Sequence, residues 1–552
     1  MRHVRWAAIC WIVVFWRLGY ASLLDPDEAH YAELTREMMH SGSWLVPLLN
    51  GRPFIDKPVL FHWLQGASVA LLGETEFAAR VPSAVAAIAL FATTRWVGAA
   101  LFGAEVGEWG AVMFATVPAT FALASIGLFD MVFASFLFGG VACLLVAAKV
   151  ERPRLERLGY LLITLAVMTK GPVALLLVLL FIAAASLAGV DTRQRLRTLH
   201  WKSGLCWVVL AASPWFVWME GRFGREFVQG YLLAGNLWYF TQPVVFSNRA
   251  ISHTFYARVF ASAFFPWSTV AIGRAVDLIH GLRAGLHLDP EEKLLWIWTV
   301  VIVAFFSAAR FKLDHYIFPA APSCCLLAAH AWHRASQDHE RRLVMTHLSV
   351  LAIAAILVVG GSFSSVYMFQ LNLDLPPTAL VLPIALAIGG MVLMTQAARR
   401  DWKTPSTAIA PVAALLASYL VVVSVGYPVL EHTRPSALVA RRLRHLTNPA
   451  APTAVYRLER WRASLRYYID RPLHRFEDPE EIKAFLARRE PVYVVLLRRE
   501  FDALQKDGLP IRMLLQERAV VGTTGKGLRR QRWGFLVVAT NELGDRTLNG
   551  DR

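Results

Sequence analysis

Charged residues are scarce in this sequence, and their scarcity excludes an ordinary soluble protein. Only 17% of the 552 residues are Asp, Glu, Lys or Arg, whereas 56% are hydrophobic; soluble domains carry about 25% charged residues. Apolar runs of about 20 residues, the length that crosses roughly 30 Å of hydrocarbon, recur up to residue 427. The bilayer is therefore the expected solvent for most of the chain.

Cysteine is also rare, and its five positions exclude a disulfide framework and a zinc motif. Cys10, Cys143, Cys206, Cys324 and Cys325 lie within or beside apolar runs, without metal-ligand spacing. The net charge of +16 does not indicate nucleic-acid binding, because much of the excess lies in short loops where it orients the chain against anionic lipid. Neither a cross-linked secreted domain nor a nucleic-acid binder fits this composition.

Basic loops predict how the chain crosses the membrane. Lys and Arg favour the cytoplasmic side, so an even number of crossings should separate each basic loop from the next. This parity predicts thirteen transmembrane helices, with the amino terminus inside and residues beyond 431 outside. The apolar segment Val59–Leu72 is expected to lie in the interface, because about 14 residues are too few for a crossing. The basic loops are Arg2 to Arg5, Lys149 to Arg157, Arg193 to Lys202, Arg274 to Lys293, Arg334 to Arg342 and Arg399 to Lys403.

The composition changes after the last apolar run, and this change predicts two domains. Residues 1–430 form the expected transmembrane domain, with an outer-face loop at 25–80, and residues 431–552 form a soluble α/β domain on the outer side. This second domain is expected either to recognise an acceptor or to act as a structural cap. Its pattern predicts strands at Thr453–Arg457, Val492–Leu497 and Phe535–Ala539 and a helix at Pro479–Arg488.

Polar residues gather in four stretches that the topology places at the outer face of the membrane, where the chain is otherwise apolar. The stretches are Asp25 to Tyr31, Asp56 to Pro58, the lone Asp130, and Arg310 to Tyr316. Ionisable groups at a membrane are costly to desolvate, so a gathering from separate loops is a functional-site hypothesis by default. We therefore predict that a site forms where these stretches meet.

The acidic stretches also have structural interpretations. Asp25 or Asp27 can cap the helix that follows, and for Asp25 the cap is favoured. The adjacent acidic pair Asp27 and Glu28, directly after a span, favours function. Asp56-Lys57-Pro58 taken alone is a turn with a local ion pair, and for Asp130 a solvated turn and a functional role stay equally open.

The basic residues have a structural interpretation as well. Arg310 and Lys312 can be interfacial anchors whose long side chains extend to water. Lys170, in Thr169-Lys170-Gly171-Pro172, has the same alternative before a helix that begins at Gly-Pro. His30 alone is more typical of an ordinary surface histidine.

Taken together, these motifs resemble the protein mannosyltransferase family, glycosyltransferase family 39. The similarity runs over residues 1–430 in consistent order, and it is closest to the bacterial branch of aminoarabinose transferases that act on lipid A. The most specific element is the setting Pro-Asp-Glu-x-x-Tyr-Ala-Glu around Asp27 and Glu28. The Trp-Trp-Asp signature of oligosaccharyltransferases is absent. The other matching elements are Asp56-Lys57-Pro58, Asp130, Thr169-Lys170-Gly171-Pro172 and Lys312 to Pro319.

This resemblance implies the GT-C fold and an inverting-type glycosyltransferase. Such enzymes move a sugar from a polyprenyl (undecaprenyl) phosphate to an acceptor hydroxyl at the outer face of the inner membrane, here on lipid A or another envelope glycan or protein. No cofactor is firmly implied, and a divalent metal stays open. The branch usually has Arg at the position of His30 and often Glu at that of Asp56, which leaves the sugar and the acceptor open. The implied catalytic residues are Asp27, Glu28 and Asp130, and Lys57, Lys312, Tyr316 and His30 are implied near the donor phosphate.

The chemistry of the residues agrees with this implication. Displacing a polyprenyl phosphate from a sugar requires a base for the incoming hydroxyl and cations for the departing phosphate, and Asp27 can supply the first and the lysines the second. One alternative is a transporter, but its charges belong near the membrane midplane, often in two repeated halves. The other is a noncatalytic envelope assembly protein, which needs no such set of carboxylates and lysines.

Overall fold

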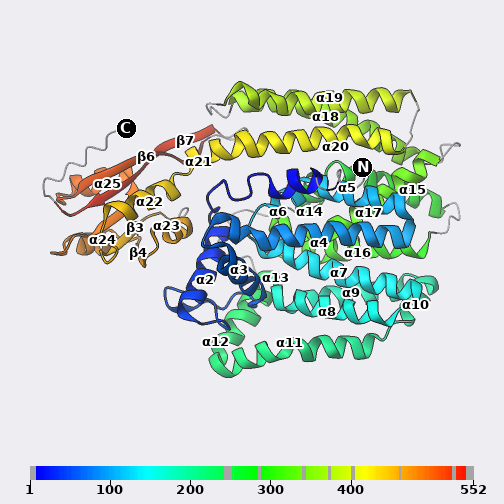
Figure 1. Ribbon diagram of the computed structural model, residues 1–552, viewed down its shortest axis with the longest axis horizontal. Helices are drawn as coiled ribbons and strands as arrows, with labels where there is room; N and C mark the ends of the chain where they lie inside the picture. The colour runs from blue at the N-terminus through cyan, green and yellow to red at the C-terminus, as the bar shows by residue number, and fades with distance from the viewer. Residues whose placement is uncertain are drawn as a thin grey trace.

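The computed structural model divides into a bundle of helices and a smaller α/β unit at one end of it (Figure 1). It describes residues 6, 8–241, 252, 254–283, 288–337, 343–370, 375–399, 404–458, 462–524 and 530–542. Of the predicted basic loops, residues 2–5, 284–287, 338–342 and 400–403 lie outside the described residues.

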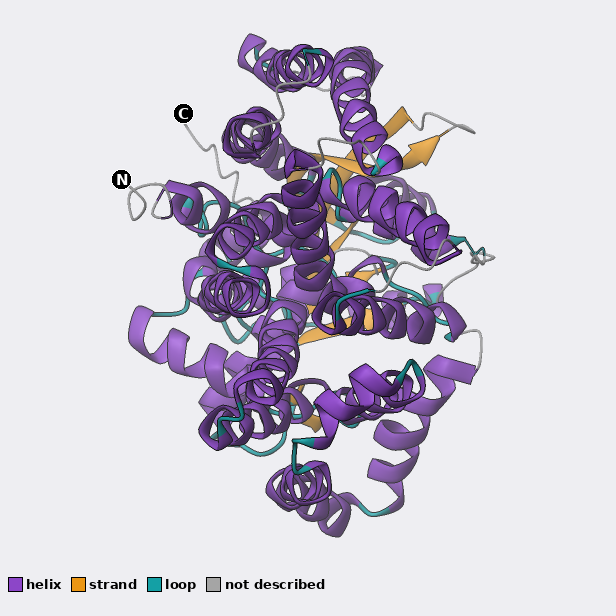
Figure 2. Ribbon diagram, turned by 90° about the vertical axis from the view of Figure 1, so that its right-hand side faces the viewer, coloured by secondary structure: helices purple, strands orange, loops and turns teal. Residues whose placement is uncertain are grey.

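The bundle consists of helices that run largely side by side, and in Figure 2 many are seen end-on with the strands behind them. Their apolar side chains form one large buried cluster, as expected where each helix has an apolar surface on several sides. The long described helices are α4 (Glu76–Phe102), α7 (Phe129–Val150), α8 (Pro153–Lys170), α9 (Val173–Leu187), α11 (Trp201–Phe223), α16 (Pro290–Ala308), α17 (Ala321–Gln337), α18 (Val344–Gln370), α19 (Val381–Ala398) and α20 (Thr404–Val421).

Within the described residues, six helices are long and apolar enough to cross a membrane singly. Two bent pairs bring the number to as many as eight. The pair α5 (Ala104–Thr116) and α6 (Pro118–Ala124) bends by 68°, and the pair α14 (Phe255–Ala263) and α15 (Trp267–Arg283) bends by 118°. The breaks fall at Pro118 and Pro266, where the ring removes a backbone donor and interrupts the helix.

The segment between the first apolar run and α4 lies at the junction of the bundle and the α/β unit (Figure 1). The helix of the first apolar run ends with η1 (Trp11–Phe15), and a loop leads from there into α2 (Asp27–Ser41). A short hairpin, β1 (Leu48–Leu49) and β2 (Arg52–Pro53), connects α2 to α3 (Leu60–Leu72). The predicted interfacial segment is therefore helical, and it packs against α2 and α4.

The α/β unit, residues 436–542, is built on a five-stranded sheet of order β4-β3-β5-β7-β6. β3 pairs in parallel with β4 and β5, whereas β7 pairs antiparallel with β5 and β6. The three predicted strands and the predicted helix coincide with β3, β5, β7 and α24; β4 and β6 were not predicted. The elements are α22 (Ser436–Leu446), β3 (Thr453–Tyr456), α23 (Arg462–Ile469), β4 (Leu473–Phe476), α24 (Pro479–Leu486), β5 (Tyr493–Leu497), α25 (Arg498–Lys506), β6 (Arg512–Thr524) and β7 (Arg530–Thr540).

The two faces of this sheet carry two separate cores. Successive strand residues point to opposite faces, so Val494 packs with α24 and α25 while Val495 packs with α22 and α23. The second of these cores continues into Ala29 and Ala32 of α2. α2 and the α/β unit therefore share one hydrophobic core.

Candidate functional site

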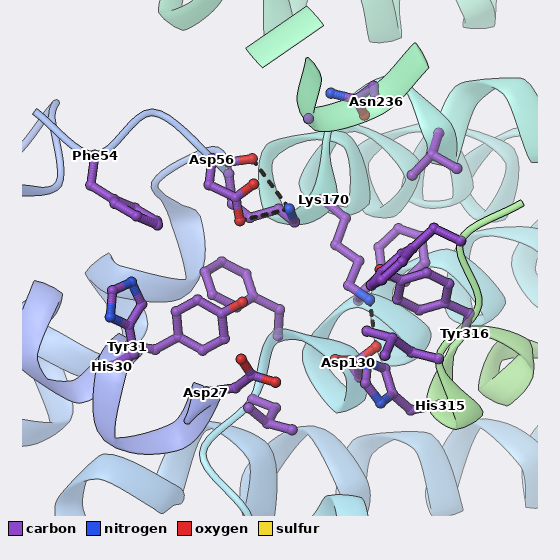
Figure 3. Close-up of a pocket in the computed structure, with 18 of the residues that line it drawn as sticks. Asp27, His30, Tyr31, Phe54, Asp56, Asp130, Lys170, Asn236, His315 and Tyr316 are labelled. Carbon is purple, nitrogen blue, oxygen red and sulfur yellow. Dashed lines mark hydrogen bonds and ion pairs between the residues drawn. The ribbon is translucent and has the colours of Figure 1, made fainter. Parts of the chain in front are cut away.

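A cavity of about 1200 Å³ lies where the bundle, α2 and the α/β unit meet. It brings together residues from all four of the polar stretches that the sequence singles out. Figure 3 shows lining side chains that come from separate elements and surround one space. The polar and charged lining residues are Asp27, His30, Tyr31, Asn50, Asp56, Lys57, Asp130, Lys170, Asn236, His315, Tyr316, Arg466 and Arg475.

Asp27 is the first residue of α2, and its carboxylate is open to the cavity (Figure 3). Pro26 occupies the N-cap position, without a side-chain cap. Within the described part of the chain, Asp27 makes no hydrogen bond or ion pair. The alternative in which Asp27 caps the helix is therefore not how this side chain is used.

The surroundings of Asp27 raise its pKa above the ordinary value. Burial by the cavity walls has the largest effect, and the neighbouring Asp130 and Asp56 add to it, whereas His315 and Lys57 act in the opposite direction. Although the side chain is open to the cavity, the walls withdraw much of the bulk water, so the neutral form gains. The carboxylate is more basic than a free Asp, as suits a group that must accept a proton.

Glu28, predicted as a catalytic partner of Asp27, is a structural residue. Its side chain is 1% exposed and forms a bidentate ion pair with Arg80 of α4, with N–O distances of 2.7 and 3.0 Å. The backbone N–H groups of Leu24 and Gly127 donate to the same carboxylate, each at 2.8 Å. Glu28 does not line the cavity. A fully buried, fully paired carboxylate holds the start of α2 on the bundle and has no free oxygen for chemistry.

Asp130 does line the cavity, but in a different setting from the predicted turn. It lies in the first turn of α7 and is 7% exposed. The ammonium of Lys170, the last residue of α8, donates to Oδ1, and Nε2 of His315 lies 3.7 Å from Oδ2. Lys170 also lies over the ring of Tyr316, 5.3 Å from its centroid. This group forms one wall, opposite Asp56 (Figure 3).

Lys57 and His30, which the resemblance implies near the donor phosphate, both line the cavity. The Lys57 ammonium donates to Oδ2 of Asp56 at 2.8 Å, and its side chain is 25% exposed, so it is accessible to a ligand. The ring of His30 packs edge-on against Phe54, with centroids 4.7 Å apart. The local pair of the Asp56-Lys57-Pro58 turn is thus present, but it faces a site rather than bulk water.

Lys312, predicted near the donor phosphate, does not line the cavity. Its ammonium donates to the backbone carbonyls of Ser307 and Ala309 at the end of α16. A cation at a helix carboxyl terminus satisfies orphan carbonyls and interacts favourably with the helix dipole. Lys312 therefore caps α16, and Lys170 is the second lysine that the cavity contains.

Comparison with known proteins identifies the fold of the chain. The structure of ArnT from Cupriavidus metallidurans bound to undecaprenyl phosphate superposes over 100% of this chain and 99% of that one, with a TM-score of 0.73 and 20% identity. The chain has the GT-C fold. The archaeal oligosaccharyltransferase AglB from Archaeoglobus fulgidus is a more distant match, with a TM-score of 0.51 and 13% identity over 90% of this chain and 68% of that one.

Sequence comparison places this GT-C chain near the aminoarabinose transferases, which it resembles. A family model described as dolichyl-phosphate-mannose-protein mannosyltransferase matches residues 56–218. The undecaprenyl phosphate-α-4-amino-4-deoxy-L-arabinose arabinosyl transferase 1 of Sodalis glossinidius is 30% identical over 373 residues, 63% of this chain and 64% of that protein. The corresponding transferase of Yersinia enterocolitica is 26% identical over 351 residues, 61% of each chain. The aligned region thus spans somewhat less than two thirds of these relatives.

Sequence reasoning missed several residues of the GT-C cavity. Lys170 lies in a recognised motif, yet it cannot be told from an anchor without its contact to Asp130. His315 stands beside Tyr316 and has no signal of its own. Arg466 and Arg475 come from the α/β unit, and no local pattern indicates that this unit reaches the site.

One described group of side chains is close enough to hold a metal ion, and it lies away from the GT-C cavity. Asp289, Glu292 and His330 have ligand atoms within 4.8 Å of one another. Glu292, in the first turn of α16, is already paired with Arg274 at 2.9 and 3.0 Å. Phe305, at the other end of α16, lines the cavity, so about 20 Å of helix separates the two. This group is not a candidate for chemistry in the cavity.

Proposed function

We propose that this protein transfers a sugar from a polyprenyl phosphate to an acceptor hydroxyl at the outer face of the inner membrane. The observation that carries the proposal is a cavity in which the carboxylate of Asp27, which pairs with no group among the described residues, shares the space with Lys57 and Lys170. The names of the relatives and the undecaprenyl phosphate bound by the C. metallidurans structure support the donor class. Lipid A, another envelope glycan and a protein stay open as acceptors.

The proposed reaction is a single displacement at the anomeric carbon. Asp27 accepts the proton of the acceptor hydroxyl as its oxygen forms a bond to the anomeric carbon, and the bond from that carbon to the phosphate oxygen breaks. The polyprenyl phosphate leaves with the bonding electrons, and lysine ammonium groups stabilise the charge that grows on it. A phosphate leaves well without protonation, so no general acid is needed. Attack opposite the leaving group inverts the sugar.

Lys170 and Asp130 have a place in this scheme. Without donor, the Lys170 ammonium is neutralised by Asp130, and His315 lies beside the same carboxylate. A donor phosphate entering the cavity offers Lys170 a second anionic partner. We assign Lys57 and Lys170 to the donor phosphate in place of Lys57 and Lys312, and we assign Asp130 to holding Lys170.

The other wall of the cavity suits the polyprenyl chain. Leu176 of α9, Leu232 and Leu237 of η2 (Val228–Trp238), and Phe305 and Phe306 of α16 line it. These side chains come from the bundle, so apolar surface continues from the cavity toward the lipid. A prenyl chain in the bilayer is already in hydrocarbon, so it binds such a surface through van der Waals packing and not through transfer from water, and this packing holds the phosphate end of the donor near the lysines.

The direct test is transfer by the purified protein in lipid nanodiscs. Polyprenyl phosphates carrying different sugars are supplied with lipid A or envelope glycan acceptors, and released polyprenyl phosphate and modified acceptor are measured by mass spectrometry. We expect release that depends on both substrates. Failure of every donor to be consumed, by protein that still binds polyprenyl phosphate, would contradict the proposal. Comparing lipid A and envelope glycans from a deletion strain identifies the natural acceptor.

We further propose thirteen transmembrane helices, a cytoplasmic amino terminus and a soluble α/β unit in the periplasm, following the basic-loop parity. Single cysteines test this in a Cys206→Ser background, which removes an exposed thiol. An impermeant thiol reagent applied to intact cells should label Glu480→Cys in α24 and leave Gln194→Cys, in α10 (Val190–Arg197), unlabelled until the membrane is opened. Both positions are exposed. The reverse labelling pattern would invert the topology and place the cavity on the cytoplasmic side.

A further inference from the structure

The loop before Asp27 is fastened to the α/β unit. Oδ1 of Asp25 accepts a hydrogen bond from the backbone N–H of Ser464 at 2.8 Å, and Oδ2 accepts one from the Ser464 hydroxyl. Ser464 is 1% exposed and lies in α23. The backbone N–H of Leu23 donates to the Tyr468 hydroxyl of the same helix, at 2.8 Å. Asp25 is thus bound to the α/β unit. The sequence favours a role for Asp25 as the cap of α2, and that prediction is wrong.

Glu28, the residue after Asp27, is fastened to the helical bundle. Glu28 is held by Arg80 and by the N–H of Gly127, both of the bundle. The three acidic residues at 25, 27 and 28 therefore divide their roles by position. Asp25 is anchored to the α/β unit and Glu28 to the bundle. Of the three residues, Asp27 alone faces the cavity.

The remainder of α2 is held against the α/β unit by ion pairs. Arg466 of α23 donates to Glu33 at 2.8 Å and to Glu37 at 2.9 Å. Arg36 donates to Asp470 at 2.6 Å and to the backbone carbonyl of Tyr467 at 2.9 Å. These pairs lie beside the core that α2 shares with the unit. They fix the helix axis, while Asp25 fixes the loop that enters it.

We propose that Asp25 and Ser464 are positioning residues for Asp27, so that the α/β unit sets the location of the catalytic base. The proposal rests on the proposed function of Asp27. Because Asp27 has no polar partner of its own among the described residues, only its backbone determines where its carboxylate lies. That backbone is held at Asp25 from one side and at Glu28 from the other. A displacement of about 1 Å can slow an enzyme by about 100-fold.

The test is a double-mutant cycle with kinetics. Asp25→Ala removes both hydrogen bonds to Ser464 and should lower kcat about tenfold, less than the loss from a full 1 Å misplacement. Ser464→Ala keeps the backbone N–H bond and should lower kcat less. The KM for a polyprenyl-phosphate sugar should stay within about twofold, because the lysines are untouched and only positioning is lost. The two changes together should cost no more than Asp25→Ala alone, because the bond that Ser464→Ala removes is one of the two that Asp25→Ala removes.

The same changes made in Asp27→Asn separate positioning from general stability. If Asp25 acts through Asp27, then Asp25→Ala should cause no further loss in that background. The matched control is Asp478→Ala, which removes the N-cap of α24 and lowers the melting temperature of the same unit without touching α2. It should leave kcat unchanged.

Two results would overturn the positioning role. One is a normal kcat in Asp25→Ala and Ser464→Ala while Asp27→Asn is slow, and the other is an equal fold loss from Asp25→Ala in the parent and in Asp27→Asn. Failure of the proposed function gives a different pattern, because Asp27→Asn is then as active as the parent or the parent transfers no sugar.

Discussion

Asp27→Asn should insert, fold and bind the polyprenyl-phosphate donor, yet transfer sugar at least about 100-fold more slowly than the parent, the lower end of what a positioned base contributes. The amide keeps the size of the side chain and removes the base. Because Asp27 caps nothing and pairs with nothing among the described residues, its replacement breaks no contact of the fold. Transfer rate and melting temperature of purified protein are measured together. An active variant of unchanged stability would remove Asp27 from the mechanism.

The pH dependence of transfer by the parent protein provides a second test of the role of Asp27 as the base. A base works only in its ionised form, so activity is lost as the pH falls through its pKa. Burial raises the pKa of Asp27, which places the acid limb of kcat/KM above the value of about 3.9 for an ordinary Asp. The residual activity of Asp27→Asn should lack this limb. An acid limb that persists unchanged in the variant would belong to another group.

Lys57→Ala should lower transfer at limiting donor by roughly 30- to 900-fold, if a cation on the departing phosphate contributes about 2 to 4 kcal/mol, as one preorganised oxyanion donor does, at about 1.36 kcal/mol per tenfold. Lys57 is accessible in the cavity, and among the residues that the structure describes it binds only Asp56 of its own turn, so its loss should not unfold the protein. Turnover is measured with a polyprenyl-phosphate sugar well below its KM.

Lys312→Ala is the matched control for Lys57→Ala. Lys312 belongs to the same set of family motifs as Lys57, but it caps α16 and does not line the cavity. Its loss should therefore lower the stability somewhat and change the transfer activity little. Near-normal turnover in Lys57→Ala would take that lysine out of the site. Equal losses in the two variants would favour the sequence-based assignment of Lys312 over the geometry.

The sequence predicts the elements of this fold better than it predicts the partners of its charged residues. Runs of apolar residues locate α4, α7 and α18 because a membrane imposes length and composition on each helix separately. Alternation locates β3 and β5 for a similarly local reason. The sequence also locates the two bends, because Pro118 and Pro266 interrupt their helices, but a proline does not determine the angle of the bend.

Site residues depend on contacts that no local pattern contains. Asp27 and Glu28 are neighbours with the same chemistry. Contacts of Glu28 with Arg80, 52 positions away, and with the backbone of Gly127 distinguish the structural carboxylate from the available one. Lys170 and Lys312 both look like anchors beside a span. Lys170 forms an ion pair with Asp130 in the cavity, whereas Lys312 donates to backbone carbonyls at the end of α16.

The ion pair between Glu28 and Arg80 limits how this junction can change over evolutionary time. Both residues are at most 2% exposed, and removing one partner of such a pair leaves a buried lone charge at a cost of about 3 to 5 kcal/mol. A typical domain is stable by only about 5 to 15 kcal/mol. Single substitutions at either position are therefore poorly tolerated. An apolar pair of similar volume would in turn leave the N–H groups of Leu24 and Gly127 and the carbonyls bound by Arg80 without partners. In lineages that share this architecture, both charges should therefore be retained together.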